Sequence, residues 1–296
     1  MTTPSEVEAR VAAGHALTRV EADQVMAWSN LVDVGALGEA ARKARSGDEV
    51  TYGLVCGVEH TLDDPGEAGE VRIVATPPST EVARQWVRAV AGRSKGVPLT
   101  GFSLADLLAL AGGDHLALSE IAASLRQEGL EAVAEVPLDA LGDTENVVEV
   151  VRAVQHGGLG AWRATVATAV SVEARLDLIE RAVELQRETG ALRALAPLPR
   201  LDPSTAPATG FDDVRTVAAA RLMAAGIPVI QVDWPLYGPK LAQVAITYGA
   251  SDIDGISPSD TLQLGHRRSP VEDIERQIRS AFAVPVRRNG RYERAS

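Results

Sequence analysis

Residues 210–255 constrain the fold of this chain more than any other stretch. Their apolar runs and helix-breaking residues predict a helix, a strand, a second helix and a second strand in succession. Asp212 can cap the first helix, and Pro239 can open the second where its missing N–H costs nothing. Residues 229–232 and 251–254 are the two strands. Consecutive α/β units of this kind are typical of a parallel sheet or barrel, which presents polar groups at the carboxyl ends of its strands.

The rest of the chain repeats this alternation of short apolar strands and amphipathic helices. Further strands are predicted within 50–56, 71–75, 97–102, 131–137, 162–170 and 191–203. We therefore predict a TIM-type (β/α) barrel, in which residues 1–296 form a single domain. Its expected parts are a helical lead-in over 1–46, the barrel over 47–255 and a C-terminal cover over 256–296. The lead-in could instead cap the lower end of the barrel, although an ordinary helical lead-in is favoured.

Composition excludes several classes of function. A net charge of −11 and a pI near 5.0 argue against a nucleic-acid partner, because phosphate binding requires clustered Lys and Arg. The chain has no run of eighteen apolar residues and no signal-peptide pattern in its first ten residues. These features predict a cytoplasmic protein without a membrane partner. Cys56 is the single cysteine, so an intrachain disulfide is excluded.

Three segments carry a resemblance to a known family. They are GFDDVRTVAAARLM, LYGPKLAQVAITYGASDIDG and SPVEDIERQIRSAFAVPVRRN. In this order and spacing they resemble the closing segments of aminofutalosine synthase and its relative dehypoxanthine futalosine cyclase. These are radical S-adenosylmethionine enzymes of menaquinone biosynthesis. The resemblance extends more weakly back to about Val71 and so covers most of the chain.

The resemblance implies a cluster-binding loop that this sequence lacks. In the family, the loop after the first strand carries C-x3-C-x2-C, whose three thiolates bind a [4Fe–4S] cluster and leave one iron for S-adenosylmethionine. Here residues 57–70 replace that loop, and Cys56 alone cannot hold the cluster. The nearby Glu59, His60, Asp63 and Asp64 are interpreted as a solvated acidic loop rather than a metal site. We therefore expect a degenerate homologue without a cluster or a metal, and with doubtful S-adenosylmethionine binding.

Two predicted strands bring candidate ligand-binding residues to the barrel. Glu135 stands at the end of its strand where the family has a Gly-rich run ending in Gly-Ala-Glu, and could bind a ribose or purine or cap a turn. Strict alternation in 162–170 places Arg163 and Thr165 toward the interior. An interior Arg needs an anionic partner, which could be a ligand or an internal acid such as Glu135 or Asp233. The Tyr-Gly-His motif of the family is replaced by residues 168–170, Thr-Ala-Val.

The last two strands supply the other candidates. Asp233 and Tyr237 follow one strand, and Asp252 and Asp254 lie at the other, at the end of a barrel where sites are formed. Asp254 precedes a glycine, so turn formation is an equal alternative. Arg200 and Asp202 are interpreted as a loop pair, and His266–Arg268 with the helix 271–282 as a cover. The basic tail from residue 287 onward is expected to be mobile.

The missing helix after the first strand leads to a hypothesis about partners. Without it, apolar surface between the first two strands would be exposed, so a partner protein, a second copy or the N-terminal helices would cover it. The favoured hypothesis is thus a cluster-less partner or regulatory subunit. The alternatives are a binder of nucleoside-like small molecules and an enzyme that uses carboxylates without a cluster, which would require a carboxylate of shifted pKa. The sequence does not decide whether catalytic activity is retained.

Overall fold

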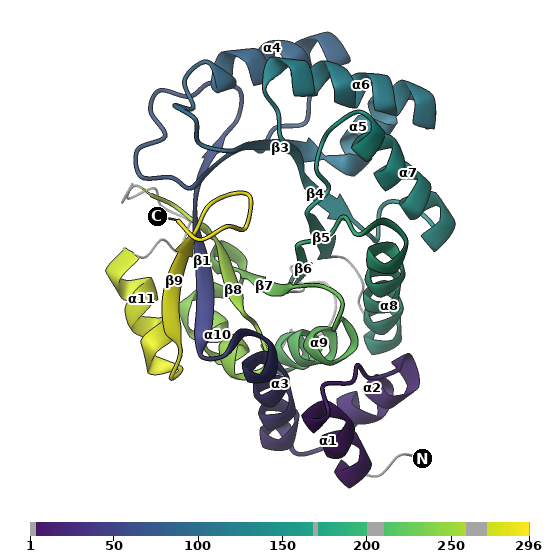
Figure 1. Ribbon diagram of the computed structural model, residues 1–296, viewed down its shortest axis with the longest axis vertical. Coiled ribbons are helices and arrows are strands. Elements are labelled where there is room, and N and C mark those ends of the chain that lie inside the picture. Colours follow the sequence, from purple (N-terminus) through teal and green to yellow (C-terminus); the bar gives the residue numbers. More distant parts are fainter. Residues whose placement is uncertain (1–3, 168–170, 200–209, 259–270, 296) are drawn as a thin grey trace.

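The structure, a computed structural model, describes residues 4–167, 171–199, 210–258 and 271–295. Eight parallel strands close into a ring in chain order, with β8 paired to β1 and β1 to β2 (Figure 1). The strands are β1 (Glu49–Val58), β2 (Glu70–Ile73), β3 (Leu99–Ser103), β4 (Ala132–Pro137), β5 (Arg163–Val166), β6 (Ala194–Pro197), β7 (Val229–Asp233) and β8 (Asp252–Ile256). The predicted TIM-type barrel is confirmed.

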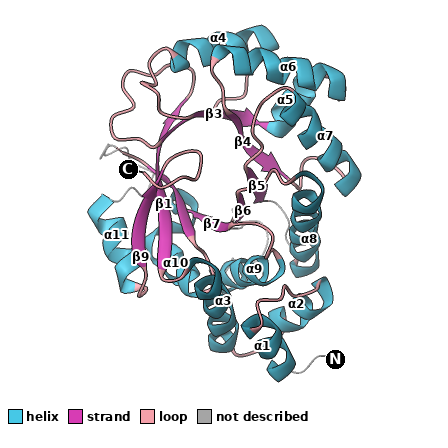
Figure 2. Cartoon of the chain, viewed as in Figure 1, coloured by secondary structure: helices cyan, strands magenta, loops and turns pink. Residues whose placement is uncertain are grey.

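Helices surround this ring, as Figure 2 shows. Those of the barrel wall are α4 (Thr80–Ala91), α5 (Leu104–Leu110), α6 (His115–Glu128), α7 (Thr144–His156), α8 (Val172–Thr189), α9 (Gly210–Met223), α10 (Trp234–Thr247) and α11 (Val271–Ser280). Asp212 lies in the first turn of α9 and not at its N-cap, so that prediction is wrong by one turn. Within α10 the chain kinks at Gly238, which has a φ of 70°, and Pro239 opens the second part as predicted.

The lead-in forms α1 (Pro4–Ala12), α2 (Arg19–Met26) and α3 (Leu31–Ser46). These helices pack on the outside of α8 and α9, so they lie beside the barrel wall and do not cap its lower end (Figure 1). A separate apolar cluster joins them to Ala218 and Leu222 of α9. Because Val214 and Val217 of the same helix pack into the main core, α9 is buried on two sides.

The core lies between the strands and the surrounding helices, and β5 shows how the sequence sets it. Ala164 and Val166 are fully buried in that core, whereas Arg163 and Thr165 face the interior of the ring. This confirms the predicted alternation. The strand is shorter than predicted, since it ends at Val166, and residues 168–170 lie outside the described residues.

The first crossover contains no helix over 59–69, as predicted, yet the ring is closed. The loop packs on α4: Leu62 is buried and the ring of His60 lies 5.6 Å from that of Trp86. Val71 and Ile73 of β2 are fully buried within the single chain. This part of the flank predicted to be exposed is therefore covered within the chain, although Val74 just after β2 is 62% exposed, and a covering partner stays a prediction.

A ninth strand from the end of the chain completes this region. β9 (Val284–Arg288) pairs with residues 49–53 of β1, on the same edge of β1 that pairs through residues 55–58 with β2. On the outside, the hydroxyl of Tyr52 in β1 donates to a carboxylate oxygen of Glu275 in α11, at 2.6 Å. Beyond β9, the N–H of Gly290 donates to the carbonyl of Gly69. The tail predicted to be mobile is therefore held against the barrel through most of its length.

Candidate functional site

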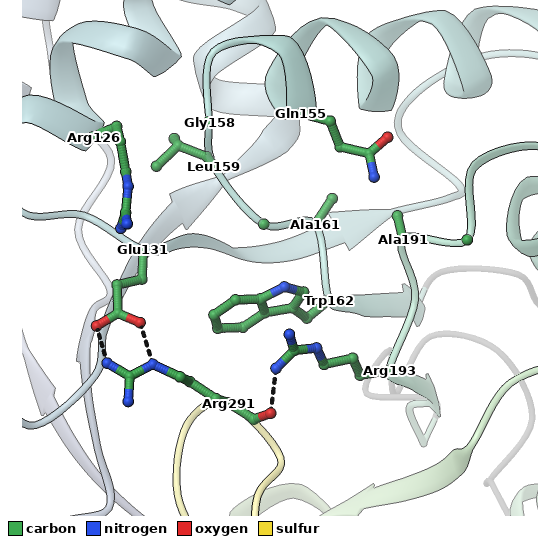
Figure 3. Close-up of a pocket in the computed structure, with 12 residues that line it drawn as sticks. Arg126, Glu131, Gln155, Gly158, Leu159, Ala161, Trp162, Ala191, Arg193 and Arg291 are labelled. Atoms are coloured by element: carbon green, nitrogen blue, oxygen red, sulfur yellow. Dashed lines mark hydrogen bonds and ion pairs between the residues drawn. The ribbon is translucent and has the colours of Figure 1, made fainter.

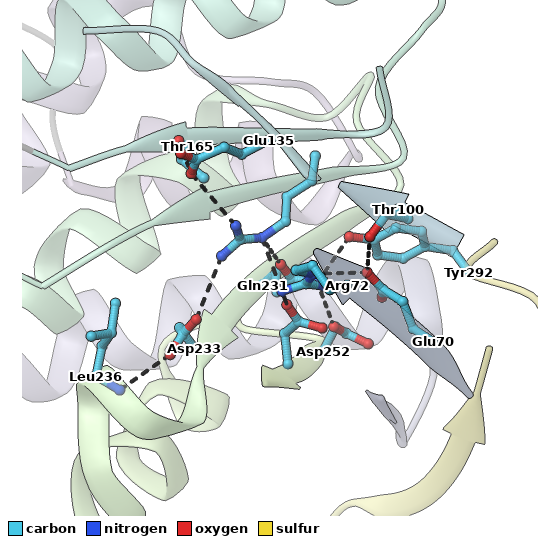
Figure 4. Close-up of polar contacts among 12 residues, drawn as sticks. Glu70, Arg72, Thr100, Glu135, Thr165, Gln231, Asp233, Leu236, Asp252 and Tyr292 are labelled. Atoms are coloured by element: carbon cyan, nitrogen blue, oxygen red, sulfur yellow. Dashed lines mark hydrogen bonds and ion pairs between the residues drawn. The ribbon is translucent and has the colours of Figure 1, made fainter. Parts of the chain in front are cut away.

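The interior of the barrel holds a group of polar side chains that we call the interior cluster (Figure 4). All of its members but one lie on strands. Where one strand contributes two members, these are two residues apart, so both side chains face the barrel axis. The interior cluster comprises Glu70, Arg72, Thr100, Glu135, Arg163, Thr165, Gln231, Asp233, Asp252, Asp254, Arg288 and Tyr292.

Arg288 of β9 forms the base of the interior cluster. Its Nε and Nη2 donate to the two carboxylate oxygens of Asp252 at 2.6 and 2.8 Å, and Nη2 also donates to Asp254 at 2.8 Å. The guanidinium lies 4.3 Å above the ring of Tyr292, whose hydroxyl accepts a hydrogen bond from Gln231. All these groups come from the chain itself, so the lower end of the barrel is filled by its own tail.

Asp254 is held between two arginines. Arg72 of β2 donates to Asp254 at 2.9 Å and to Glu70 at 2.8 Å, and Glu70 also accepts from the hydroxyl of Thr100 at 2.6 Å. Burial alone would raise the pKa of Asp254, but Arg72, Arg288 and Arg163 outweigh it and lower that pKa. Asp254 is therefore a fixed negative charge and not a proton carrier.

Arg163 is the first residue of β5, and its guanidinium, which reaches toward Asp233 at the end of β7, is held less tightly. Its Nε donates to the amide oxygen of Gln231 at 2.6 Å. Its Nη1 and Nη2 lie 3.8 Å from Glu135 and 3.6 Å from Asp233, beyond hydrogen-bond length. The side chains of Glu135 and Asp233 are 32% and 15% exposed, against 8% for Arg163. Two nitrogens of the guanidinium thus lie near carboxylates that are partly open to solvent.

The charges of the interior cluster do not balance, because it contains five carboxylates and three guanidiniums. Asp233 is where this imbalance has its clearest effect. Burial raises its pKa, the charge of Arg163 opposes this, and the charge of Asp254 adds to the rise. Asp233 also accepts the N–H of Leu236 and so caps α10. A carboxyl group of raised pKa near the open end can exchange a proton more readily than its neighbours.

The structure brings together six of the seven residues predicted for the site, namely Glu135, Arg163, Thr165, Asp233, Asp252 and Asp254. Tyr237 is not among them, because it is buried in α10 and donates to the carbonyl of Pro197 at 2.6 Å. The alternative in which internal acids pair with Arg163 is observed. Arg200, Asp202 and His266–Arg268 lie outside the described residues.

Sequence reasoning missed half of the interior cluster: Glu70, Arg72, Thr100, Gln231, Arg288 and Tyr292. Alternation could have found Glu70 and Arg72, since the strand EVRI places both opposite its two apolar residues. No local pattern identifies Arg288 or Tyr292, because their positions depend on a strand pair formed across almost the whole chain.

The residues present do not fit the [4Fe–4S] cluster that the family resemblance implies. Cys56, near the end of β1, is the only thiol in the sequence, and burial followed by the charge of Asp64 raises its pKa. Iron binds the thiolate, which a raised pKa disfavours. Among the described residues, no group of three or more His, Cys, Asp or Glu is arranged to hold a metal ion.

A hollow of about 470 Å³ lies at the lower face, where the tail meets the starts of β4, β5 and β6 (Figure 3). The guanidinium of Arg193 covers the ring of Trp162 at 4.3 Å and donates to the carbonyl of Arg291. Arg291 in turn binds Glu131 through two hydrogen bonds of 2.6 and 2.7 Å. These contacts tie the tail to the barrel, so the principal charges of the hollow are already used within the chain.

Fold and site together define a closed (β/α) barrel with an ionised interior, in which Glu135 and Asp233 are partly exposed. Among curated proteins, 5-amino-6-(D-ribitylamino)uracil–L-tyrosine 4-hydroxyphenyl transferase of Methanothermobacter thermautotrophicus is 30% identical over 239 residues, covering 70% of this chain and 64% of that protein. Aminodeoxyfutalosine synthase of Streptomyces coelicolor is 34% identical over 140 residues, covering 40% of this chain and 36% of that protein. The chain is thus a relative of the aminodeoxyfutalosine synthases, as its motifs indicate. Its matches span less than two thirds of the length of these two relatives.

Solved structures agree on the fold. Methylornithine synthase has a TM-score of 0.66 at 13% identity, covering 95% of this chain and 97% of that one. HydG, a maturase of the [FeFe]-hydrogenase, has a TM-score of 0.68 at 12% identity, covering 96% of this chain and 76% of that one. No protein-family model matches the chain. Across the described part of the chain, every helix is too short or too polar to cross a lipid bilayer.

Proposed function

We propose that this chain is a non-radical relative of these enzymes that binds a ribosyl- or ribityl-bearing small molecule at Glu135, Arg163 and Asp233. The observation that carries the proposal is the loose arrangement of these three side chains at 3.6–3.8 Å, where a ligand can supply the missing hydrogen bonds. Carboxylates accept hydrogen bonds from vicinal hydroxyls, and the guanidinium donates to a heterocycle carbonyl. The names of the relatives contain a ribitylaminouracil and a futalosine-type nucleoside, which share this chemistry.

The proposal includes that the chain acts without a [4Fe–4S] cluster of its own. Its support is the single thiol of raised pKa and an interior filled by Arg72 and Arg288. With no cluster to start radical chemistry, the remaining reactive group is Asp233, whose raised pKa suits a proton acceptor for a bound hydroxyl or amine. The regulatory-subunit hypothesis rests on the missing cysteines and on an exposed flank, of which Val71 and Ile73 are buried within the chain. Ligand binding is the function that the geometry of Glu135, Arg163 and Asp233 supports best.

The proposal is tested by calorimetric titration of the full chain with adenosine, 5-amino-6-(D-ribitylamino)uracil, aminodeoxyfutalosine and S-adenosylmethionine. We expect one ribosyl- or ribityl-bearing compound to bind, and to stabilise the fold by about 2.7 kcal/mol at a hundred times its Kd. Glu135→Gln should weaken binding about tenfold, since a hydrogen bond to a charged group contributes about 1.5–3 kcal/mol. Glu59→Gln is the matched control, because Glu59 is 79% exposed and lies outside the interior cluster.

Two results would overturn the proposal. One is binding that is unaffected by both Glu135→Gln and Asp233→Asn. The other is stoichiometric uptake of a cluster when the same preparation is reconstituted anaerobically with iron and sulfide, with the uptake lost in Cys56→Ser.

A further inference from the structure

A second group of arginines lies outside the barrel, where α3 and α9 meet the connection between α1 and α2. They surround a hollow of about 160 Å³, with Arg221 of α9, Arg45 of α3 and His15 among its lining residues. No carboxylate lines the hollow among the described residues. This is unusual in a chain of net charge −11, since acidic side chains would be expected beside surface arginines.

Arg221 is buried, with 3% of its surface exposed, and is incompletely hydrogen-bonded. Its Nε donates to the carbonyl of Gly249 at 2.8 Å and its Nη2 donates to the hydroxyl of Ser251 at 2.7 Å. Its Nη1 is buried and has no hydrogen-bond partner among the described residues. A buried charged donor in this state is strongly unfavourable unless an anion pairs with it.

The surroundings of Arg221 disfavour the positive charge of its guanidinium. Arg42, which is fully buried, also has two nitrogens, Nε and Nη2, without a partner. Burial, followed by the charges of Arg45 and Arg42, lowers the pKa of Arg221 to about 9. Arg288 in the barrel shows the usual solution to the same problem, because its guanidinium is buried against two carboxylates. The charges of Glu39 and Asp48 favour the ionised form of Arg42, whereas the charged groups that act on Arg221 are both arginines.

We propose that this hollow, which we call the outer anion site, binds a small oxyanion through Arg221 and Arg45. The chemical class is a phosphate, sulfate or carboxylate group, either as a free ion or as the terminal group of a small metabolite. The volume fits this class: it is several times the roughly 30 Å³ of a water molecule and below the roughly 300 Å³ of sites for drug-sized ligands. The outer anion site does not depend on the function proposed for the interior cluster.

The experiment is a titration of the full chain with inorganic phosphate at constant ionic strength, followed by phosphorus NMR and by thermal unfolding, with sulfate and acetate as further arms. We expect one phosphate per chain and an increase in melting temperature. Arg45→Gln should weaken phosphate binding about tenfold, through loss of one charge-assisted hydrogen bond. Arg276→Gln is the matched control, because this arginine on α11 is 72% exposed and lies far along the chain from the outer anion site.

A second variant distinguishes an anion-binding site from a cluster of arginines that binds no anion. Ala225→Glu places a carboxylate beside the hollow, and should raise the melting temperature while abolishing the effect of phosphate. The proposal fails if phosphate, sulfate and acetate all leave melting and NMR unchanged, or if Arg45→Gln and Arg276→Gln weaken binding equally. In that case the partial negative charge at the C-terminal ends of α3 and α9 would be enough to stabilise Arg45 and Arg221, which lie in the last turns of these helices. Stronger binding of acetate than of phosphate would identify the carboxylate source.

Discussion

At the scale of single residues, Arg288 and Arg221 are two of several buried arginines, and their surroundings are opposite. Arg288 has two carboxylates and an aromatic ring around its guanidinium, whereas Arg221 has two carbonyl or hydroxyl acceptors and cationic neighbours. The first is a closed structural arrangement. The second is open to a ligand, although burial alone does not distinguish the two residues.

Arg288 should be among the residues most important for stability. In Arg288→Met, Asp252 and Asp254 would stay buried without their main counter-charge, so we expect the free energy of unfolding to fall by about 3–5 kcal/mol. Urea denaturation measures this as a lower midpoint at an unchanged slope. Arg276→Gln is again the control and should leave the midpoint unchanged. A loss below about 1 kcal/mol would contradict the proposed role of this pair of carboxylates.

Asp233 should show the reverse behaviour. A carboxyl group whose pKa is raised on folding takes up protons as the chain folds, so its ionisation at neutral pH opposes folding. Asp233→Asn removes this charge and keeps the cap on α10, because Asn caps as well as Asp. We expect the variant to be more stable than the wild type at pH 7, with the difference shrinking as the pH falls toward about 3.9, the unfolded value.

The measurement is urea unfolding of both chains across this pH range. Asp63→Asn, at a fully exposed position, should show no such trend. Equal stability of the Asp233→Asn variant and the wild type at every pH would rule out the raised pKa. A gain in stability combined with weaker ligand binding would indicate that Asp233 is retained for function.

Part of the site was predictable at this scale. Alternation in β5 is strict enough to turn Arg163 and Thr165 inward, and Asp233 ends β7 as predicted. Asp252 and Asp254, predicted at the end of the last strand, are instead the first and third residues of β8. The pairing of these residues was not predictable, because it depends on Arg288 and Tyr292 reaching the same place from the tail. The hydrogen bond from the Tyr237 hydroxyl to a backbone carbonyl of β6 was not predictable either, because a backbone acceptor carries no sequence signal.

At the scale of elements, β9 depends on close contact with the loop before β2. A Cβ atom on Gly69 would lie 2.7 Å from the carbonyl oxygen of Arg288. This oxygen belongs to the backbone, so relieving the clash requires the backbone itself to move. Gly69→Ala should therefore displace the end of β9 and reduce the free energy of unfolding by about 1–3 kcal/mol. Urea unfolding and limited proteolysis of the tail measure the two effects.

Gly57 provides the matched control for this prediction. A Cβ atom there would meet only Val74 at 3.8 Å, an ordinary van der Waals contact, so Gly57→Ala should leave both stability and the tail unaffected. Equal proteolysis of the tail in the two variants would contradict a specific role of Gly69 in seating β9.

Most elements could be predicted because their signals are local. Caps such as Ser79, Asp143 and Ser171 mark helix starts, and short apolar runs mark the strands. β9 was missed because VPVRR contains a proline and two arginines, which is the composition of an exposed segment. β9 is stabilised by pairing with the edge of β1 and by the contacts of Arg288 with buried aspartates. These partners are distant in the sequence, so a local pattern does not reveal them.

At the scale of the whole molecule, the succession of α/β units was enough to predict the barrel. It could not show how the barrel compensates for the helix missing after β1. The answer combines three distant segments: the loop 59–69 on α4, the helix α11 outside β1, and β9 along the edge of β1. Each contributes part of the burial that one crossover helix would otherwise provide.

The pairing of β1 with β9 also sets the order of events when the chain is made. Residues 49–53 are synthesised more than 200 residues before their partners at 284–288. At cellular synthesis rates this interval is roughly 10–50 s, during which β1 has an unpaired edge and Asp252 and Asp254 have no Arg288. An open strand edge is prone to associate with other chains. The edge of β1 can therefore pair with β9 only after residues 284–288 have been made, and until then the growing chain has to avoid association through this edge.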